Sequence, residues 1–181
     1  MAEKEKMLDG QMYDGFDPTL LQERQRARVL LSELNQLIDN NARKAVIKRL
    51  FGKVGTGFWI EPPFYCDYGF NIEAGNNVFI NFDCVFLDCN KIFLGDNLQI
   101  APKVQIYTAT HPLNAAERIK GAESALPVKI GRNCWIGGGA IICPGVEIGN
   151  NTTIGAGSVV TKNVPAGVLA AGNPCRVIRT V

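Results

Sequence analysis

Six aliphatic residues in the C-terminal part of the chain recur at an unbroken spacing of six: Ile130, Ile136, Ile142, Ile148, Ile154 and Val160. Glycine follows each isoleucine of this series except Ile142. An amphipathic helix repeats about every 3.6 residues and a strand face about every two, so neither explains this period. A period of six is typical of a parallel β-helix, in which an aliphatic residue points inward and small residues close each corner. We therefore expect a mainly β fold built from hexapeptide repeats.

Two shorter runs upstream carry the same spacing: Ile72, Val78 and Cys84, then Leu94, Ile100 and Ile106. The phase breaks between Cys84 and Leu94, where the gap fits one hexad plus a small insertion. It breaks again between Ile106 and Ile130, where residues 112–127 combine turn-forming residues with charged ones. We expect a protruding loop near 112–127. Loops of this length in a compact domain are more often functional than tolerated surface insertions.

The N-terminal third follows a helical pattern instead. Asp17 followed by Pro18 predicts a helix start, because an acidic cap and a proline at the first helical position are both favourable. Apolar residues then recur at helical spacing: Leu20, Leu21, Val29, Leu30, Leu34 and Leu37. We expect the charged residues between them to form a solvated face: Glu23, Arg24, Arg26 and Arg28. In this interpretation Asn40 and Asn41 end the helix, and a second helix over 42–51 stops at Gly52.

These helices suit the open end of a solenoid, where unpaired strand edges need cover. We therefore assign residues 1–56 to an N-terminal helical cap. Residues 57–181 form the β-helix domain, with the loop near 112–127.

Composition agrees with a single globular domain. The chain has 181 residues, of which 46% are hydrophobic and 20% charged, and this is enough to bury one extended core. A net charge of +2 indicates neither a nucleic-acid partner nor a membrane surface. No apolar run reaches transmembrane length and the first residues are charged, so we expect a cytoplasmic protein. The six cysteines contain no CxxC pair and are interpreted as reduced thiols, with Cys84 and Cys134 buried.

His111 is the only histidine, and it lies where the repeat gives way to the long loop. This position predicts an imidazole at the edge of the coil, accessible to a ligand. Imidazole exchanges protons near neutral pH, so it is the natural base for a hydroxyl group.

The C-terminal segment contains no acidic residue after Glu147, while Lys162, Arg176 and Arg179 remain. Cations and glycine-rich turns of this kind suit a phosphate-bearing ligand. A basic, solvated tail explains the same composition equally well.

Five segments resemble the maltose and galactoside O-acetyltransferases, a family of hexapeptide-repeat acyltransferases: Pro63–Gly69, Asn81–Val85, Ile106–Pro112, Asn133–Gly139 and Ala171–Arg176. The resemblance extends from Glu3 almost to Val181. It implies a left-handed parallel β-helix, a homotrimer and acetyl-CoA bound between neighbouring subunits. The handedness follows from this resemblance alone, since general crossover rules favour the opposite hand.

The resemblance also implies roles for single residues. His111 matches the catalytic base, which accepts the proton of the acceptor hydroxyl as that oxygen attacks the thioester directly. Asn81 matches a polar residue of the acceptor site that donates to a sugar oxygen or to the oxyanion. Asp67 matches another acceptor-binding position. Asp17 either reaches the acceptor or serves only as a helix cap.

For the donor, Trp135 matches the aromatic residue beside the pantetheine arm. Further positions match contacts to coenzyme A that use mostly backbone groups: Gly138, Ala156, Thr161 and Lys162. Arg176 and Arg179 match its phosphate partners. Galactoside enzymes have an acidic residue where this chain has Cys89, following Asp88. This difference favours a maltose- or glucose-like sugar acceptor over a galactoside.

Two other classes of protein can be built on a coil of this kind. A carbonic-anhydrase-like coil needs three histidine ligands, and one histidine excludes it, so we expect no metal. An acetyltransferase for an antibiotic or serine, or a non-catalytic binding or scaffold coil, remains an alternative. The presence of His111 together with Asn81, Trp135 and Lys162 favours an active sugar O-acetyltransferase.

Overall fold

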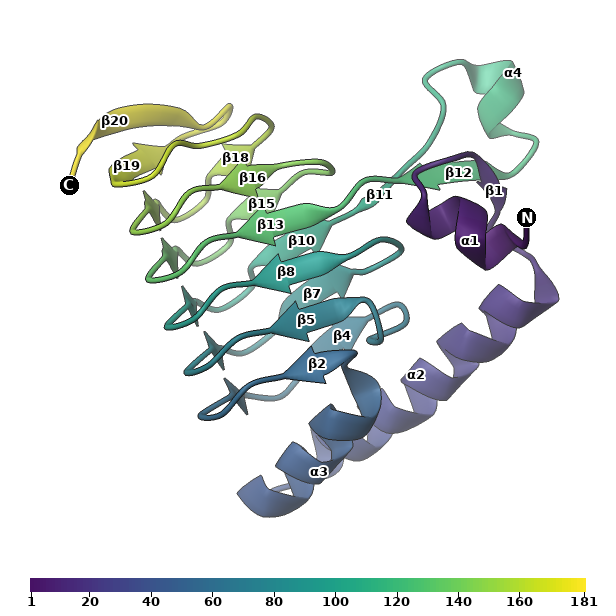
Figure 1. The fold of residues 1–181 in the computed structure, drawn as a ribbon, viewed down its shortest axis with the longest axis horizontal. Helices are drawn as coiled ribbons and strands as arrows, with labels where there is room; N and C mark the ends of the chain where they lie inside the picture. The colour runs from purple at the N-terminus through teal and green to yellow at the C-terminus, as the bar shows by residue number, and fades with distance from the viewer.

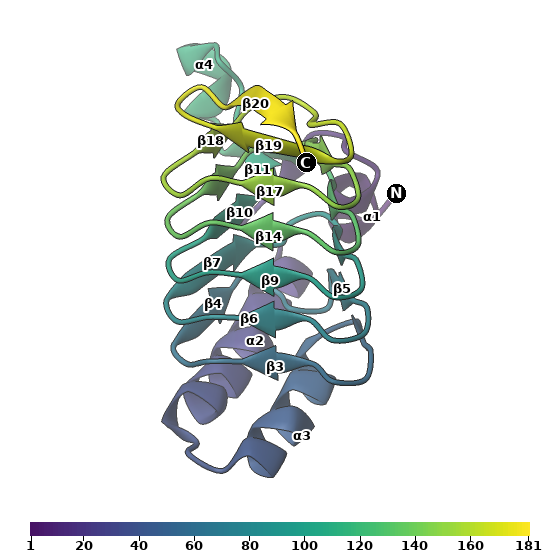
Figure 2. The same cartoon turned by 90° about the vertical axis from the view of Figure 1, so that its left-hand side faces the viewer.

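The structure is a computed structural model that describes residues 1–181. Three parallel sheets form the faces of a left-handed β-helix (Figures 1 and 2). The first face contains β2 (Lys53–Val54), β5 (Ile72–Ala74), β8 (Ile92–Leu94), β13 (Val128–Ile130) and β16 (Glu147–Ile148). The second contains β3 (Trp59–Ile60), β6 (Phe79–Ile80), β9 (Gln99–Ile100), β14 (Trp135–Ile136), β17 (Thr153–Ile154) and β19 (Val168–Ala171), with antiparallel β20 (Arg176–Thr180) at its edge. The third contains β4 (Phe64–Cys66), β7 (Cys84–Leu87), β10 (Gln105–Tyr107), β15 (Ile141–Ile142) and β18 (Val159–Val160).

The repeat residues form the core, as the spacing predicts. All members of the three hexad runs are at most 3% exposed. Cys84 and Cys134 are buried among them, which confirms that part of the cysteine prediction.

The register of the first run differs from the simplest interpretation of the spacing. Ile72 pairs with Ile92, whereas the strand neighbour of Leu94 is Ala74. The residues aligned with the downstream hexads are therefore Ala74, Ile80 and Phe86, which also keep the spacing of six. The predicted run and the aligned run are both buried, because side chains two positions apart on a strand point to the same face. In β5, for example, Ile72 and Ala74 both point inward.

The helical cap covers the N-terminal end of the coil (Figure 1). It consists of α2 (Pro18–Gln36) and α3 (Asn40–Leu50), and the Phe51 ring packs edge-on against Phe58 and at a tilt against Phe64, both in the first turn. The predicted boundary at Asn40 and Asn41 was wrong, since Asn40 begins α3. The chain leaves α2 at Leu37, which is extended, and the carboxylate of Asp39 caps α3 by accepting from Ala42 N.

The predicted apolar face of α2 needs correction as well. Leu21 and Val29 are 45% and 59% exposed, whereas Ala27 and Leu31 are buried. Ala27 is fully buried in the main core, although alanine contributes little to a hydrophobic pattern in the sequence.

The insertion between the third and fourth turns protrudes from the prism, as expected, and is itself structured (Figure 1). It contains β11 (Ala109–Thr110), α4 (Ala115–Arg118) and β12 (Ala122–Ala125), and β11 and β12 pair antiparallel. The start of the chain, α1 (Glu3–Leu8) and β1 (Tyr13–Asp14), packs against this insertion, with β1 antiparallel to β12. A second small core joins the two segments to the coil: Met7, Tyr13, Leu20, Tyr68, Cys89 and Ala125.

Candidate active site

His111 directly follows β11, at the base of the protruding insertion, and is exposed. Its Nδ1 lies 3.4 Å from the carbonyl oxygen of Ala122 on β12. A carbonyl can only accept a hydrogen bond, so this contact favours the tautomer with its proton on Nδ1. Nε2 then carries the lone pair, as a general base requires.

A group of carboxylates and hydroxyls lies at the same corner of the prism. Asp67, in the turn after β4, is half-buried, and its Oδ2 accepts a hydrogen bond from Cys89 Sγ at 3.6 Å. Burial raises the pKa of the Asp67 carboxyl, and burial also raises the pKa of the Cys89 thiol. On the opposite side, the Tyr13 hydroxyl donates to Glu123 Oε2 at 2.8 Å. Four separate segments therefore bring polar groups to one place near the His111 hairpin.

Arg24 does not belong to a solvated face, contrary to the expectation from helical periodicity. Its Nη1 donates to the Tyr68 hydroxyl at 2.6 Å, and its Nη2 donates to the carbonyl of Gly15. The guanidinium also lies over the Tyr68 ring, 5.6 Å from its centroid. Arg24 thus ties α2 to the turn that carries Asp67, a contact that spacing along one helix could not reveal.

Asp17 caps α2, the alternative that the sequence left open. Its Oδ1 accepts from Thr19 N at 2.9 Å and from Leu20 N at 3.2 Å. Both bonds use the same oxygen, so Oδ2 remains available to a ligand.

Asn81 lies at a different corner, between the second and third faces. Its backbone N–H donates to Ile100 O at 2.9 Å, and its Oδ1 accepts from Phe82 N at 2.8 Å. This leaves the Nδ2 group free to donate. No hydrogen bond joins Asn81 to His111 or Asp67 within the chain, so one chain does not assemble all the predicted acceptor residues.

At the corner that carries Asn81, side chains give way to glycine towards the C-terminus, which leaves a bare corner there. One residue in each successive turn of this corner has a left-handed backbone conformation. These residues are Asp83, Lys103, Gly139 and Gly157, with φ of 60°, 60°, 69° and 69°. A Cβ on Gly139 or Gly157 would meet nothing within 4 Å, so internal packing does not demand glycine there. Gly137 is different, because its Cβ would lie 2.5 Å from Ala156 N, and glycine is required for that structural reason.

The residues matched to coenzyme A border this bare corner or lie near it. Trp135 is 55% exposed on the second face, and Gly138 and Ala156 lie in the corner turns. Thr161 and Lys162 follow β18, and Arg176 and Arg179 lie on β20. The three cations are exposed and form no ion pair within the chain. An exposed indole, uncovered backbone and free cations fit a ligand with an extended arm and phosphates.

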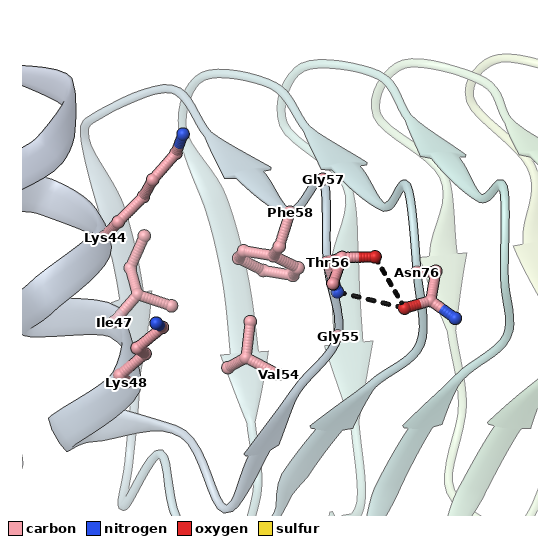
Figure 3. A pocket seen from close by; sticks show the side chains of 9 residues that line it. All are labelled: Lys44, Ile47, Lys48, Val54, Gly55, Thr56, Gly57, Phe58 and Asn76. Carbon is pink, nitrogen blue, oxygen red and sulfur yellow. Dashed lines mark hydrogen bonds between the residues drawn. The ribbon is translucent and has the colours of Figure 1, made fainter.

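A recess of about 420 Å³ lies between α3 and the first turn of the coil (Figure 3). Phe58, Ile47 and Val54 line it, with Lys44 and Lys48 at the rim. It contains none of the residues predicted for the site, and it belongs to the junction of cap and coil.

Four residues at the corner that carries Asp67 and His111 were not identified from the sequence: Tyr13, Arg24, Asp88 and Glu123. The ten-residue gap between Cys84 and Leu94 was the available signal for Asp88, because the insertion that it indicates contains this residue. The chain has no group of three or more His, Cys, Asp or Glu side chains placed to hold a metal ion. No helix is long and apolar enough to cross a membrane.

Comparisons with known proteins identify the family to which this coil belongs. The maltose acetyltransferase hexapeptide capping motif matches residues 6–55, and the bacterial transferase hexapeptide model of six repeats matches residues 127–162. A maltose O-acetyltransferase from Clostridium difficile has the same fold, with a TM-score of 0.99 and 50% identity over 100% of this chain and 98% of that one.

A hexapeptide-repeat acetyltransferase from Vibrio cholerae, solved with acetyl coenzyme A, gives a TM-score of 0.94. It is 38% identical over 99% of this chain and 98% of that chain. Nodulation protein L of Rhizobium meliloti is 48% identical, with 97% of each chain covered.

The hexapeptide coil, its capping helices and these similarities together define an acetyl-CoA-dependent acetyltransferase of the hexapeptide-repeat class. Within that class the chain belongs to the maltose and galactoside O-acetyltransferase family, on its maltose branch.

Proposed function

We propose that the protein transfers acetyl from acetyl-CoA to a hydroxyl of a maltose- or glucose-like sugar, with His111 as the general base. The observation that carries this proposal is the contact between His111 Nδ1 and the carbonyl of Ala122, which leaves Nε2 basic. The base lies at the same corner as the half-buried carboxylates of Asp67 and Glu123, and the hydroxyl groups of a sugar can donate to such carboxylates.

In the reaction, Nε2 of His111 takes the proton of the acceptor hydroxyl as the oxygen attacks the thioester carbonyl. The Nδ2 group of Asn81 donates to the developing oxyanion. The imidazolium then returns its proton to the departing thiolate, so protons balance. The base supplies about 10²–10⁴-fold, and the remainder comes from holding both substrates together.

The cysteines support direct transfer without an acyl-enzyme. Burial raises the pKa of every thiol in the chain: Cys66, Cys84, Cys89, Cys134, Cys143 and Cys175. The thiolate is the nucleophilic form, so these environments disfavour a cysteine nucleophile.

The site is proposed to form between subunits of a homotrimer. Asn81, Gly138 and Ala156 lie at one corner of the prism, whereas His111 and Asp67 lie at another. Apposition of one corner with the other corner of a second copy would bring the donor and acceptor residues together. Repeated around a three-fold axis, this arrangement closes on itself.

The proposal is tested by thiol release from acetyl-CoA with maltose, glucose, galactosides, serine and chloramphenicol, together with light scattering for the assembly. We expect release with glucosyl sugars by a trimer. Release only with serine or chloramphenicol would move the acceptor outside the sugars. Silence without acetyl-CoA binding would support a scaffold instead.

A further inference from the structure

The first turns of the coil are longer than the last ones, and the extra residues lie next to the candidate site. Side chains stacked in adjacent turns are 20 residues apart in the first turns and 18 in the last. The longer connection follows β7 and contains Asp88, Cys89 and Asn90, which are at most 6% exposed. Three buried residues with polar or ionisable side chains in a coil corner require an explanation, because buried polar groups are costly unless they are paired.

Asp88 binds the turn that carries Asp67. Its Oδ1 accepts from Asp67 N at 3.0 Å and from Tyr68 N at 2.8 Å, and its Oδ2 accepts from Asn71 N at 3.3 Å. Asn71 returns the contact, since its Nδ2 donates to Asp88 O at 2.8 Å. The Asp88 carboxylate forms no ion pair. Its two oxygens accept hydrogen bonds only from backbone N–H groups of residues 67–71.

Asn90 binds the opposite side, where the His111 hairpin begins. Its Nδ2 lies 2.9 Å from the carbonyl oxygen of Ala125 on β12, and 3.1 Å and 3.2 Å from those of Met7 and Leu8. Its backbone N–H donates to Thr108 Oγ1 at 2.8 Å. Thr108 precedes β11, and β12 supplies the carbonyl that contacts His111, so both strands of the hairpin are held from Asn90.

We propose that Asp88 and Asn90 are positioning residues that set the Asp67 turn and the His111 hairpin relative to each other. Neither residue touches a substrate in this proposal. Cys89, between them, lies against Asp67 itself. The roles of Asp67 and His111 rest on the proposed function, whereas the coupling between the two segments does not.

The test uses the single histidine, whose imidazole resonances need no assignment by mutation. Wild-type protein, Asn90→Ser, Asp88→Ala and Asp88→Asn are compared by NMR and by acetyl-transfer kinetics. Asn35→Ser is the matched control, because the Asn35 side-chain amide also binds a backbone segment. Its Oδ1 accepts from Phe64 N at 2.9 Å, and its Nδ2 donates to Phe64 O at 3.0 Å. That contact joins the end of α2 to the start of β4, and no hydrogen bond joins either residue to the insertion.

We expect Asn90→Ser and Asp88→Ala to shift the imidazole resonances, and Asn35→Ser to leave them in place at a comparable loss of melting temperature. Acceptor kcat/KM should fall about 10- to 100-fold in the first two variants, with acetyl-CoA affinity unchanged. Asp88→Asn retains an oxygen for Asp67 N and Tyr68 N, so it should recover much of the loss.

Unchanged imidazole resonances in both Asn90→Ser and Asp88→Ala would overturn the proposal, as would an equal shift in Asn35→Ser. If the wild-type protein transfers acetyl to no acceptor, the proposed function fails. The imidazole resonances still decide the positioning role in that case.

Discussion

Asn97 donates from Nδ2 to Oδ1 of Asn133 at 3.0 Å, although 36 residues separate them in the chain. The same contact joins Asn77 to Asn97 at 3.1 Å and Asn133 to Asn151 at 2.8 Å. The insertion that carries His111 leaves the coil between Asn97 and Asn133, yet this asparagine ladder crosses it without a break. The coil therefore closes as a complete scaffold, and the insertion is mounted on one of its corners.

Asn133→Ala should destabilise the protein by about 2 kcal/mol. Asn133 has φ +57°, where a residue with a Cβ is strained and asparagine is better tolerated than alanine. Alanine also removes both ladder bonds of this position. Urea unfolding measures the effect, with Asn133→Gly as the control that loses the bonds but relieves the backbone. An alanine variant as stable as the glycine variant would contradict the strain argument.

His111→Ala should reduce acetyl transfer by about 10²–10⁴-fold while fold and acetyl-CoA binding persist. The side chain is exposed and makes one long contact, at 3.4 Å, so little packing is lost. Turnover, melting temperature and acetyl-CoA affinity are measured on the same preparation. Turnover near the wild-type level would refute the base assignment.

Asp88→Asn should change how stability depends on pH. Burial raises the pKa of Asp88 to about 7, above the ordinary value of about 3.9 for an unfolded chain. The folded protein therefore binds this proton more tightly, and the stability linked to it is present below pH ~4 and lost as pH rises through ~7. Asp67, also with a raised pKa, is the neighbouring charge.

Asparagine cannot ionise, so the stability advantage of wild type over Asp88→Asn should shrink between pH 5 and pH 8. Urea unfolding at both pH values gives the difference. Asp83→Asn, an exposed change at a left-handed position, is the control. A wild-type advantage that stays constant with pH would show that Asp88 does not titrate in this window.

Cys89→Asp should destabilise the protein, and more at pH 8 than at pH 5. The Cys89 thiol is 6% exposed, and Sγ lies 3.6 Å from Asp67 Oδ2, so the substitution buries a second carboxylate beside the first. Burial and the neighbouring negative charge of Asp67 both favour the protonated form of the new carboxyl group. The folded protein therefore loses stability as pH rises, because ionising this group is costlier in the folded state than in the unfolded chain. Melting temperatures are compared with those of neutral Cys89→Ser, and equal losses at both pH values would argue against charge repulsion.

Acetyl-CoA should quench the fluorescence of Trp135, which is 55% exposed on the second face of the coil. Trp59→Phe removes the other tryptophan and makes the signal specific. In this background Lys162→Ala should weaken acetyl-CoA binding about 10- to 150-fold, because a charged hydrogen bond to phosphate is worth about 1.5–3 kcal/mol. Lys129→Ala, which removes a cation already paired with Glu147, should leave the affinity unchanged. Equal effects of both lysines would indicate attraction by net charge alone.

The sequence predicted the features that depend on short-range order. A spacing of six identifies the coil because each inward residue is buried by the equivalent residue one turn away. Asp17 and Pro18 mark the start of α2 because capping is a local interaction. His111 stood out because it is unique and adjoins the break in the repeat.

The tertiary structure decided the register of the first hexad run, the inward role of Arg24 and the positions of Asp88 and Asn90. Asn90 reaches Met7 across 83 residues and Arg24 reaches Tyr68 across 44, and no local pattern encodes such partners. The coil itself was predictable because each of its turns repeats the same local solution. The corner around His111 was not, because five distant segments meet there and only their packing determines which polar groups face each other.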